Sequence, residues 1–237
     1  MLSATAWLIG GTGLITMVIS IIFGLFFIYK AKKLDAKLLY LTGLLIISTG
    51  LLYLGASATF LCMLFTGKNI PNETGVHGLL SFTSIAPGIV CGMYLGSELL
   101  APKKKKIIVG IYAIIAVVFE IILYICPRCA LKFTNEDSST DLIDSSFVLL
   151  YPTFIFVVVF LISILVFCGI GSLIKAQQAS GDLKKKFRFL SLGFTIFVIS
   201  GALDALVAPG IWLIFIRLGM ITYAWLLYFG LKPAKIS

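Results

Sequence analysis

The sequence predicts an all-α membrane protein: a bundle of seven transmembrane helices with the N-terminus outside and the C-terminus in the cytoplasm. The first observation behind this prediction is composition, because 60% of the 237 residues are hydrophobic, 12% are charged and the mean hydropathy is +1.10. Soluble domains hold about 45–50% apolar and about 25% charged residues, so this chain belongs in a lipid bilayer. The other two observations are the lengths of its apolar runs and the positions of its basic residues.

Seven apolar runs are long enough to span a membrane, since a helix of about 20 apolar residues crosses about 30 Å of hydrocarbon. We expect one transmembrane domain, 1–237, with spans at 6–29, 38–66, 76–100, 107–126, 147–174, 187–207 and 211–231. Only Ala208, Pro209 and Gly210 separate the last two spans. Pro-Gly is a turn signal, and the combined run is far too long for a single crossing, so two helices are expected.

The basic residues predict the orientation, because lysine and arginine accumulate in cytoplasmic loops. One set of alternate connections and the C-terminal tail contain Lys30, Lys32, Lys33, Lys37, the lysines at 103–106 and 184–186, Lys175, Arg188, Lys232 and Lys235. The opposite connections contain only Lys68, Arg128 and Lys132. A multi-pass protein of the cell membrane with basic inner loops beside anionic lipid is therefore expected. This placement accounts for the net charge of +9 without a nucleic-acid partner.

Three ionisable residues inside the spans are candidate site residues, because each costs about 2.5–3.5 kcal/mol at a helix centre. At a rise of 1.5 Å per residue, Glu120, Asp204 and Arg217 lie about 9, 5 and 9 Å from the outer ends of their helices. Two carboxylates and one guanidinium leave one negative charge uncompensated. Either one carboxylate is protonated, or a cationic or hydrogen-bonding guest completes the cluster. The alternative is an ion pair that only joins helices, with Glu120 neutral or turned to the lipid edge.

A polar face on the span 76–100 is expected to complete a ligand-binding pocket. His77, Ser81 and Ser84 recur at helical spacing and so share one face of this helix. The alternative is structural: the hydroxyls would bond helix to helix, Pro87 would kink the span, and His77 would be an interfacial hydrogen-bonding group.

The run VVFEIILYICPRC ends at the outer surface in Cys126-Pro127-Arg128-Cys129. A C-x-x-C beside an arginine can form a reactive thiol. Membrane disulfide-forming oxidoreductases need a second cysteine pair, however, and here only Cys62 is placed to take part. A structural disulfide, either local or to Cys62, is therefore the preferred interpretation. No metal is expected, because zinc needs four well-placed ligands and only His77 would join the two cysteines.

The predicted topology resembles that of rhodopsins and G-protein-coupled receptors. The span 211–231 has no lysine for retinal, so no cofactor is expected. The stretches LLYLTGLLIISTGLLYLG (38–55) and LLAPKKKKIIVGIYAIIAVVFEIIL (99–123) resemble uncharacterised archaeal seven-helix membrane proteins and, loosely, the seven-helix membrane input domains of histidine kinases. This resemblance implies a helical membrane domain. No kinase or output domain is expected after residue 237, so signalling would need a separate partner.

The favoured function is that of a sensor or receptor-like protein that binds a small ligand from the outer side and signals through the basic cytoplasmic loops to a separate partner. Two alternatives stay open: a small-solute transporter, and a thiol-disulfide oxidoreductase using Cys126 and Cys129. Transporters often show internal repeats, broken helices and polar residues at the midplane. Here no repeat is evident and the polar residues lie in the outer half, so binding and signalling are expected ahead of transport or enzymatic activity.

Overall fold

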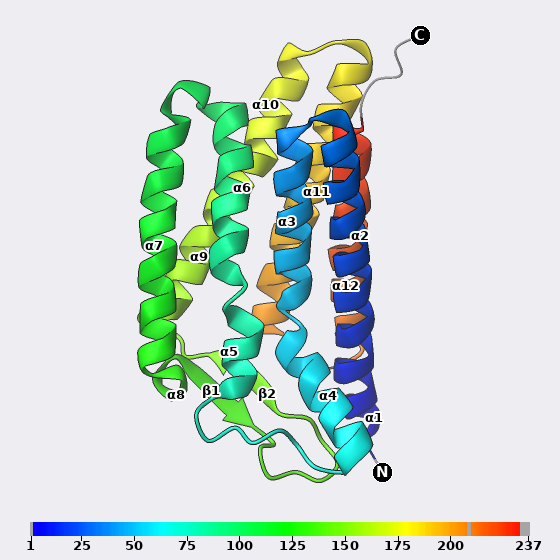
Figure 1. Ribbon diagram of the computed structural model, residues 1–237, viewed down its shortest axis with the longest axis vertical. Helices are drawn as coiled ribbons and strands as arrows, with labels where there is room; N and C mark the ends of the chain where they lie inside the picture. Colours follow the sequence, from blue (N-terminus) through cyan, green and yellow to red (C-terminus); the bar gives the residue numbers. More distant parts are fainter. Residues whose placement is uncertain (1, 208–209, 233–237) are drawn as a thin grey trace.

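The computed structural model describes residues 2–207 and 210–232, which form a bundle of long, nearly parallel helices with a small β-hairpin at one end (Figure 1). The prediction of a helical bundle is confirmed at this level. The predicted turn at Ala208 and Pro209 and the tail residue Lys235 lie outside the described residues.

The described residues form these helices and strands, in chain order from the N-terminus. They are α1 (Ala4–Ala6), the π-helical turn η1 (Trp7–Gly11), α2 (Thr12–Leu34), α3 (Lys37–Leu51), α4 (Leu54–Thr66), α5 (Val76–Phe82), α6 (Ile85–Leu100), the 3-10 turn η2 (Pro102–Lys104), α7 (Lys105–Ile125), α8 (Pro127–Ala130), β1 (Leu131–Thr134), β2 (Asp144–Phe147), α9 (Pro152–Ile164), the π-helical turn η3 (Leu165–Ile170), α10 (Gly171–Gln178), α11 (Gly181–Leu206) and α12 (Trp212–Leu231).

Six helices in the described part of the chain are long and apolar enough to cross a membrane, which makes this a multi-pass membrane protein. They are Ala4–Leu34, Val76–Leu100, Pro102–Ile125, Pro152–Gln178, Gly181–Leu206 and Trp212–Leu231. A seventh crossing requires α3 and α4 together, which are bent by 46° at the break between them. The outer face of α7 shows why water is the wrong surrounding: its exposed side chains include Ile107, Ile111, Ile114, Ile121 and Ile125, a stripe that suits lipid.

Two predicted spans need correction at their boundaries. The span expected at 38–66 is not one straight helix, because it breaks after Leu51. The span expected at 147–174 begins at Pro152 and runs to Gln178. Proline suits the first turn of a helix, where its missing N–H is not needed. The residues before it pair as a strand: β2 is antiparallel to β1, with Leu131 opposite Phe147.

The β-hairpin was not expected from the sequence. Its strands have only four residues each, and the segment between them is acidic and polar, a composition that by itself indicates a loop. Tertiary burial stabilises it, because Leu131, Leu142 and Ile143 are each 1% exposed. The hairpin is therefore anchored to the end of the bundle by apolar side chains.

The two broken helices pack against each other, α3 on α6 and α4 on α5, so their breaks lie at a similar level along the bundle (Figure 1). Pro87 explains one break, because it has no N–H to donate to the carbonyl of Thr83. At the other, the Tyr53 N–H donates to the Gly50 carbonyl, 3.1 Å away, in a tightened turn. Both breaks lie where α3 and α4 pack on α5 and α6, so neighbouring helices cover part of the irregular backbone.

Close packing of α4 on α5 depends on Gly55. A methyl group on Gly55 would overlap the carbonyl oxygen of His77 and the hydroxyl of Ser81. The missing side chain therefore lets α5 approach α4 closely and determines where His77 and Ser81 lie.

Candidate functional site

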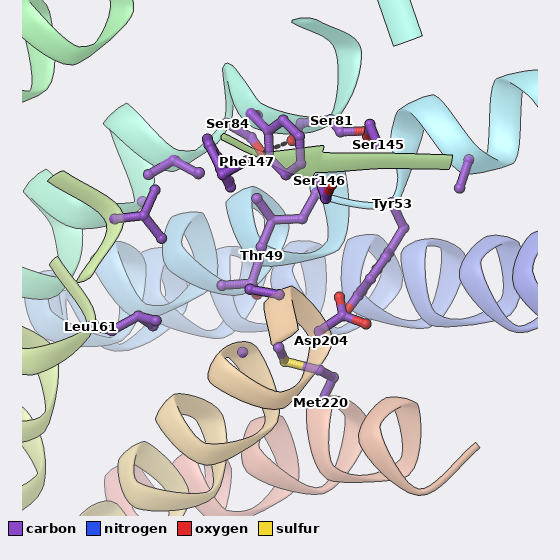
Figure 2. A pocket seen from close by; sticks show the side chains of 18 of the residues that line it. Thr49, Tyr53, Ser81, Ser84, Ser145, Ser146, Phe147, Leu161, Asp204 and Met220 are labelled. Carbon is purple, nitrogen blue, oxygen red and sulfur yellow. Dashed lines mark hydrogen bonds between the residues drawn. The ribbon is translucent and has the colours of Figure 1, made fainter. Parts of the chain in front are cut away.

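A cavity of about 450 Å³ lies inside the bundle at the end that bears the hairpin. Small-molecule pockets have volumes of about 300–1,000 Å³, so this cavity could hold a small ligand. Its walls come from α3, α4, α5, α6, α9, α11, α12 and β2. Figure 2 shows Ser145, Ser146 and Phe147 of β2 crossing one side, with Thr49 and Met220 on the walls beneath.

An ion pair lies at one side of the cavity. Arg217 of α12 donates from Nη1 to Asp204 Oδ2 of α11, 3.2 Å away. The ring of Tyr53, at the break between α3 and α4, covers the guanidinium with its centroid 3.7 Å from the Arg217 Cζ atom. Figure 2 shows Tyr53 pointing toward Asp204. The pair is held by consecutive antiparallel helices, so its two members are brought together by the connection between them.

Two buried polar atoms at this pair make no hydrogen bond of normal geometry with the residues that the structure describes: Arg217 Nε, and the Tyr53 hydroxyl, which is directed toward Asp204 (Figure 2). Arg217 is 7% exposed and Tyr53 is 3% exposed. Burying polar atoms without partners costs about 1–3 kcal/mol each. Atoms of this kind next to a cavity can form hydrogen bonds with a ligand or with water in it.

His77, Ser81 and Ser84 all line the same cavity from α5 and the break that follows it. The Ser81 hydroxyl donates to the His77 carbonyl at 3.1 Å, and the Ser84 hydroxyl donates to the Ser81 carbonyl at 3.3 Å. Both serines therefore have their protons committed to the backbone and retain lone pairs for a guest.

The hydrogen bonds around His77 assign its tautomer. Thr59 Oγ1 donates to the Gly55 carbonyl at 2.9 Å and lies 2.9 Å from His77 Nδ1. A hydroxyl has one proton, so Thr59 accepts from Nδ1–H. In the neutral ring Nε2 is then an acceptor. The Asn72 side chain also accepts from the His77 backbone N–H at 2.9 Å, which holds the start of α5 in place.

Asp144 is a site residue that the sequence alone did not reveal. It lies at the start of β2 and lines the cavity, and the charges of Asp204 and Arg217 both influence its pKa. Burial is the main reason that the pKa of Asp144 is raised above its usual value; the backbone N–H of Ser145, 3.0 Å from Oδ1, and Arg217 act in the opposite direction. The one signal in the sequence was the apolar pair Leu142-Ile143 within a polar segment, which anchors the residue after it.

Glu120 does not belong to this cavity, so the predicted cluster of Glu120, Asp204 and Arg217 is wrong in its first member. Glu120 lines a separate apolar groove of about 700 Å³ beside Thr83, Pro87 and Tyr124. The reason is packing, because α7 lies mainly against α6 and α9, away from α12 (Figure 1). Its Oε1 atom has no hydrogen-bond partner within the described ranges.

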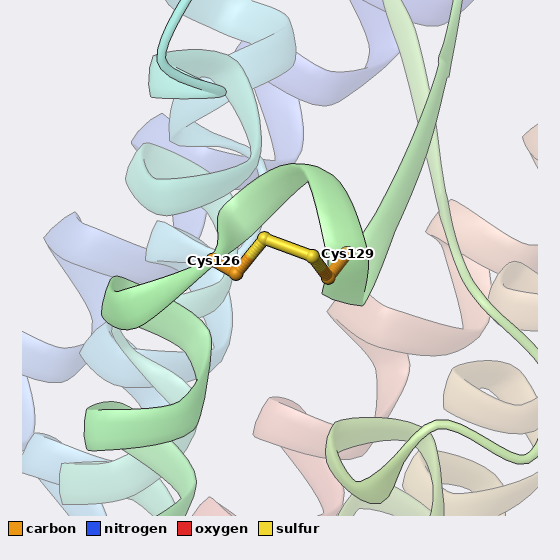
Figure 3. The surroundings of a disulfide bond; sticks show 2 residues. All are labelled: Cys126 and Cys129. Carbon is orange, nitrogen blue, oxygen red and sulfur yellow. A yellow bond between two sulfur atoms is a disulfide. The ribbon is translucent and has the colours of Figure 1, made fainter.

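The cysteines lie apart from the cavity. Cys126 and Cys129 form a disulfide across the short helix α8 (Figure 3), with their Cα atoms 5.2 Å apart. Cys62 is a free thiol, and neither disulfide partner lines the cavity. Arg128, between the two, donates to Glu136 Oε1 at 3.0 Å and to the carbonyls of Asn72 and Glu73, so it joins two loops. Across the described residues, no three His, Cys, Asp or Glu side chains gather closely enough to hold a metal ion.

The fold and cavity define a class, a multi-pass helical membrane protein with a polar and apolar internal cavity. No protein-family model matches the chain, and no curated protein sequence matches it closely enough to count as a relative. The resemblance to archaeal seven-helix proteins and histidine-kinase input domains stays a prediction.

Proposed function

We propose that this chain is a seven-span sensor of the cell membrane that binds a small ligand from the outer side in the cavity. The observation that carries the proposal is the composition of that cavity. Its walls combine a buried ion pair, a third charged side chain at Asp144, hydroxyl groups and apolar side chains from separate helices. Such a mixture is typical of small-molecule sites, in which a few polar groups orient a ligand against apolar walls.

The distribution of basic residues supports an outer location for the cavity. The connections α2–α3, α6–α7 and α10–α11, which contain the lysine clusters, lie at the end of the bundle opposite the hairpin (Figure 1). The positive-inside rule makes the lysine-rich end cytoplasmic, with the N-terminus and the cavity toward the outside. Each basic residue near the inner surface would contribute about 1 kcal/mol of attraction to anionic lipid.

The orientation can be tested with two matched serine-to-cysteine variants in a background without the free cysteines. Ser139 lies in the hairpin and Ser180 in the α10–α11 connection, and both are exposed. We expect a membrane-impermeant maleimide to label Ser139→Cys in intact cells and to label Ser180→Cys only after the membrane is opened. Labelling in the reverse order would invert the proposed topology.

The route for a signal follows α3 and α6. Both helices contribute wall residues to the cavity and continue to the basic end, where Lys37 begins α3 and the lysines at 103–106 follow α6. A ligand shifts a conformational equilibrium only through contacts that differ between two states. Breaks beside the cavity supply points at which the inner halves of these helices can shift. A separate cytoplasmic partner would read that shift.

A transporter is the second candidate, and the two adjacent helix breaks favour it. Discontinuous helices that meet at a binding site are common in secondary transporters. Purified protein in liposomes separates the two functions: a sensor binds its ligand without net uptake, whereas a transporter accumulates it. Ligand uptake that depends on the protein would replace the sensor proposal with transport.

Binding itself can be tested by thermal unfolding in lipid nanodiscs against a library of small acids, amines and neutral compounds. A ligand present at 100 times its dissociation constant stabilises the folded state by about 2.7 kcal/mol. The variant Gly201→Leu should remove this stabilisation, because a Cβ there makes only ordinary contacts and the added side chain grows into the cavity.

The matched control is Gly110→Leu, because a Cβ on Gly110 meets no atom within 4 Å. We expect this variant to keep full ligand stabilisation. If the hits stabilise Gly201→Leu as well as the native protein, they bind elsewhere and the cavity is not the site.

A further inference from the structure

The charges of the cavity favour a cationic guest, and this inference rests on the proposed function. Arg217 is the one lysine or arginine among the described residues that line the cavity, and its charge is already paired with Asp204 at 3.2 Å. Tyr53 covers one face of the guanidinium. The carboxylates of Asp204 and Asp144 outnumber this single cation on the described wall, which disfavours an anionic guest. Of the described carboxylates that line the cavity, Asp144 is the one that forms no ion pair with a described lysine or arginine.

The hydrogen-bonding groups of the wall point to the same ligand chemistry. The protons of Ser81 and Ser84 are donated to backbone carbonyls, and the Thr49 hydroxyl donates to the Ile46 carbonyl at 2.8 Å. His77 carries its proton on Nδ1, where Thr59 accepts it. These side chains therefore offer acceptor lone pairs. A guest that supplies N–H donors satisfies these acceptors. Arg217 Nε, which has no partner among the described residues, is a donor and is left for an oxygen of the guest or of water.

Apolar and aromatic side chains make up the rest of the wall. Phe82, Phe147, Phe160 and Phe197 reach the cavity from four different elements. Aromatic faces attract cations as well as apolar groups. The ligand that fits has a charged head near Asp144 and an apolar body among these rings.

We propose that the cavity binds a small organic ammonium ion with an apolar body, whose charge is held by Asp144 and whose N–H groups are accepted by the serine and histidine side chains of the α5–α6 break.

The test uses three compounds with one phenyl body and different charge: 2-phenylethylammonium, 3-phenylpropionate and 2-phenylethanol. Binding to the protein in nanodiscs of uncharged lipid is measured by calorimetry at neutral pH. We expect the ammonium compound to bind and the carboxylate not to bind. Preferential binding of the carboxylate or the alcohol would overturn the ligand class while leaving the cavity as a binding site.

Substitutions locate the charge. Asp144→Asn should weaken ammonium binding by about 30-fold, because the half-buried carboxylate proposed to hold the ammonium charge is lost. Asp144→Glu keeps a carboxylate and should retain the preference for the ammonium compound, and Asp137→Asn, at a position in the same hairpin that does not line the cavity, should change nothing.

Equal ammonium affinity in Asp144→Asn and the native protein would refute the role of Asp144. If none of the three compounds binds, the ammonium class is refuted. The proposed function is then decided separately by the library and the Gly201→Leu variant, which do not depend on ligand charge.

Discussion

Removing Arg217 should destabilise the protein far more than removing both members of its ion pair. The substitution Arg217→Leu leaves Asp204 without its cation at a site where the Asp204 side chain is only 24% exposed. Breaking a buried pair in this way costs about 3–5 kcal/mol. The partial exposure of Asp204 to the cavity places the expected cost near the lower end, about 3 kcal/mol. Loss of the contact with the Tyr53 ring adds about 0.5–1 kcal/mol.

The double variant Arg217→Leu with Asp204→Leu removes both charges and leaves no stranded carboxylate. Replacing a buried ion pair by apolar residues is often neutral in stability, so we expect a total cost of about 1 kcal/mol. The double variant should therefore be less destabilised than either single variant. The interaction energy between the two sites, which is the sum of the single costs minus the cost of the double variant, is expected to be about 2 kcal/mol or more.

The assay is reversible unfolding in mixed micelles, followed by circular dichroism, for the native protein, both single variants and the double variant. Additive costs would refute the argument, since they would mean that neither group depends on the other. This cycle tests the ion pair alone. A pair that serves only packing gives the same result, and ligand binding separates the two roles.

Three further predictions concern the helix packing, the titration of the cavity and the disulfide. Gly55→Ala should destabilise the fold by about 1–3 kcal/mol, because the methyl group overlaps the His77 carbonyl. The control Gly110→Ala should be tolerated. Equal unfolding midpoints for the two variants would contradict the close packing of α4 on α5. Ammonium affinity should fall on acidification, because only the ionised form of Asp144 holds the cation. The fall should begin at a higher pH than for an ordinary aspartate, because burial raises the pKa of Asp144. Asp204, Arg217 and His77 also face the site, so the pH dependence is assigned to Asp144 only if Asp144→Asn removes it. Replacing Cys126 and Cys129 by serine should lower the free energy of unfolding by at most about 2 kcal/mol, because the loop that the disulfide closes is short. Ligand binding should stay intact. Loss of a thiol-oxidising activity in this variant would favour the oxidoreductase alternative instead.

Local sequence determined most of the membrane helices, because the length of an apolar run decides by itself whether a helix can cross a bilayer. It also determined which residues of one helix share a face, so the spacing of His77, Ser81 and Ser84 grouped three residues that line the same cavity. The Asp204–Arg217 pair was predictable for a related reason: their helices are consecutive and antiparallel, so nothing but a turn decides whether they meet.

The tertiary structure alone decided which segments distant in the chain lie beside the ion pair. Glu120 is at the expected depth, yet α7 packs on α6 and α9 and turns this residue into another groove. Asp144 takes its place because Leu142 and Ile143 are buried against the bundle, a long-range contact that four-residue strands do not reveal. The break at Tyr53 likewise belongs to the tertiary structure, in which α4 packs on α5. The sequence carried the chemistry of each residue and its depth along a helix; the direction in which each helix faces was settled by packing between elements far apart in the chain.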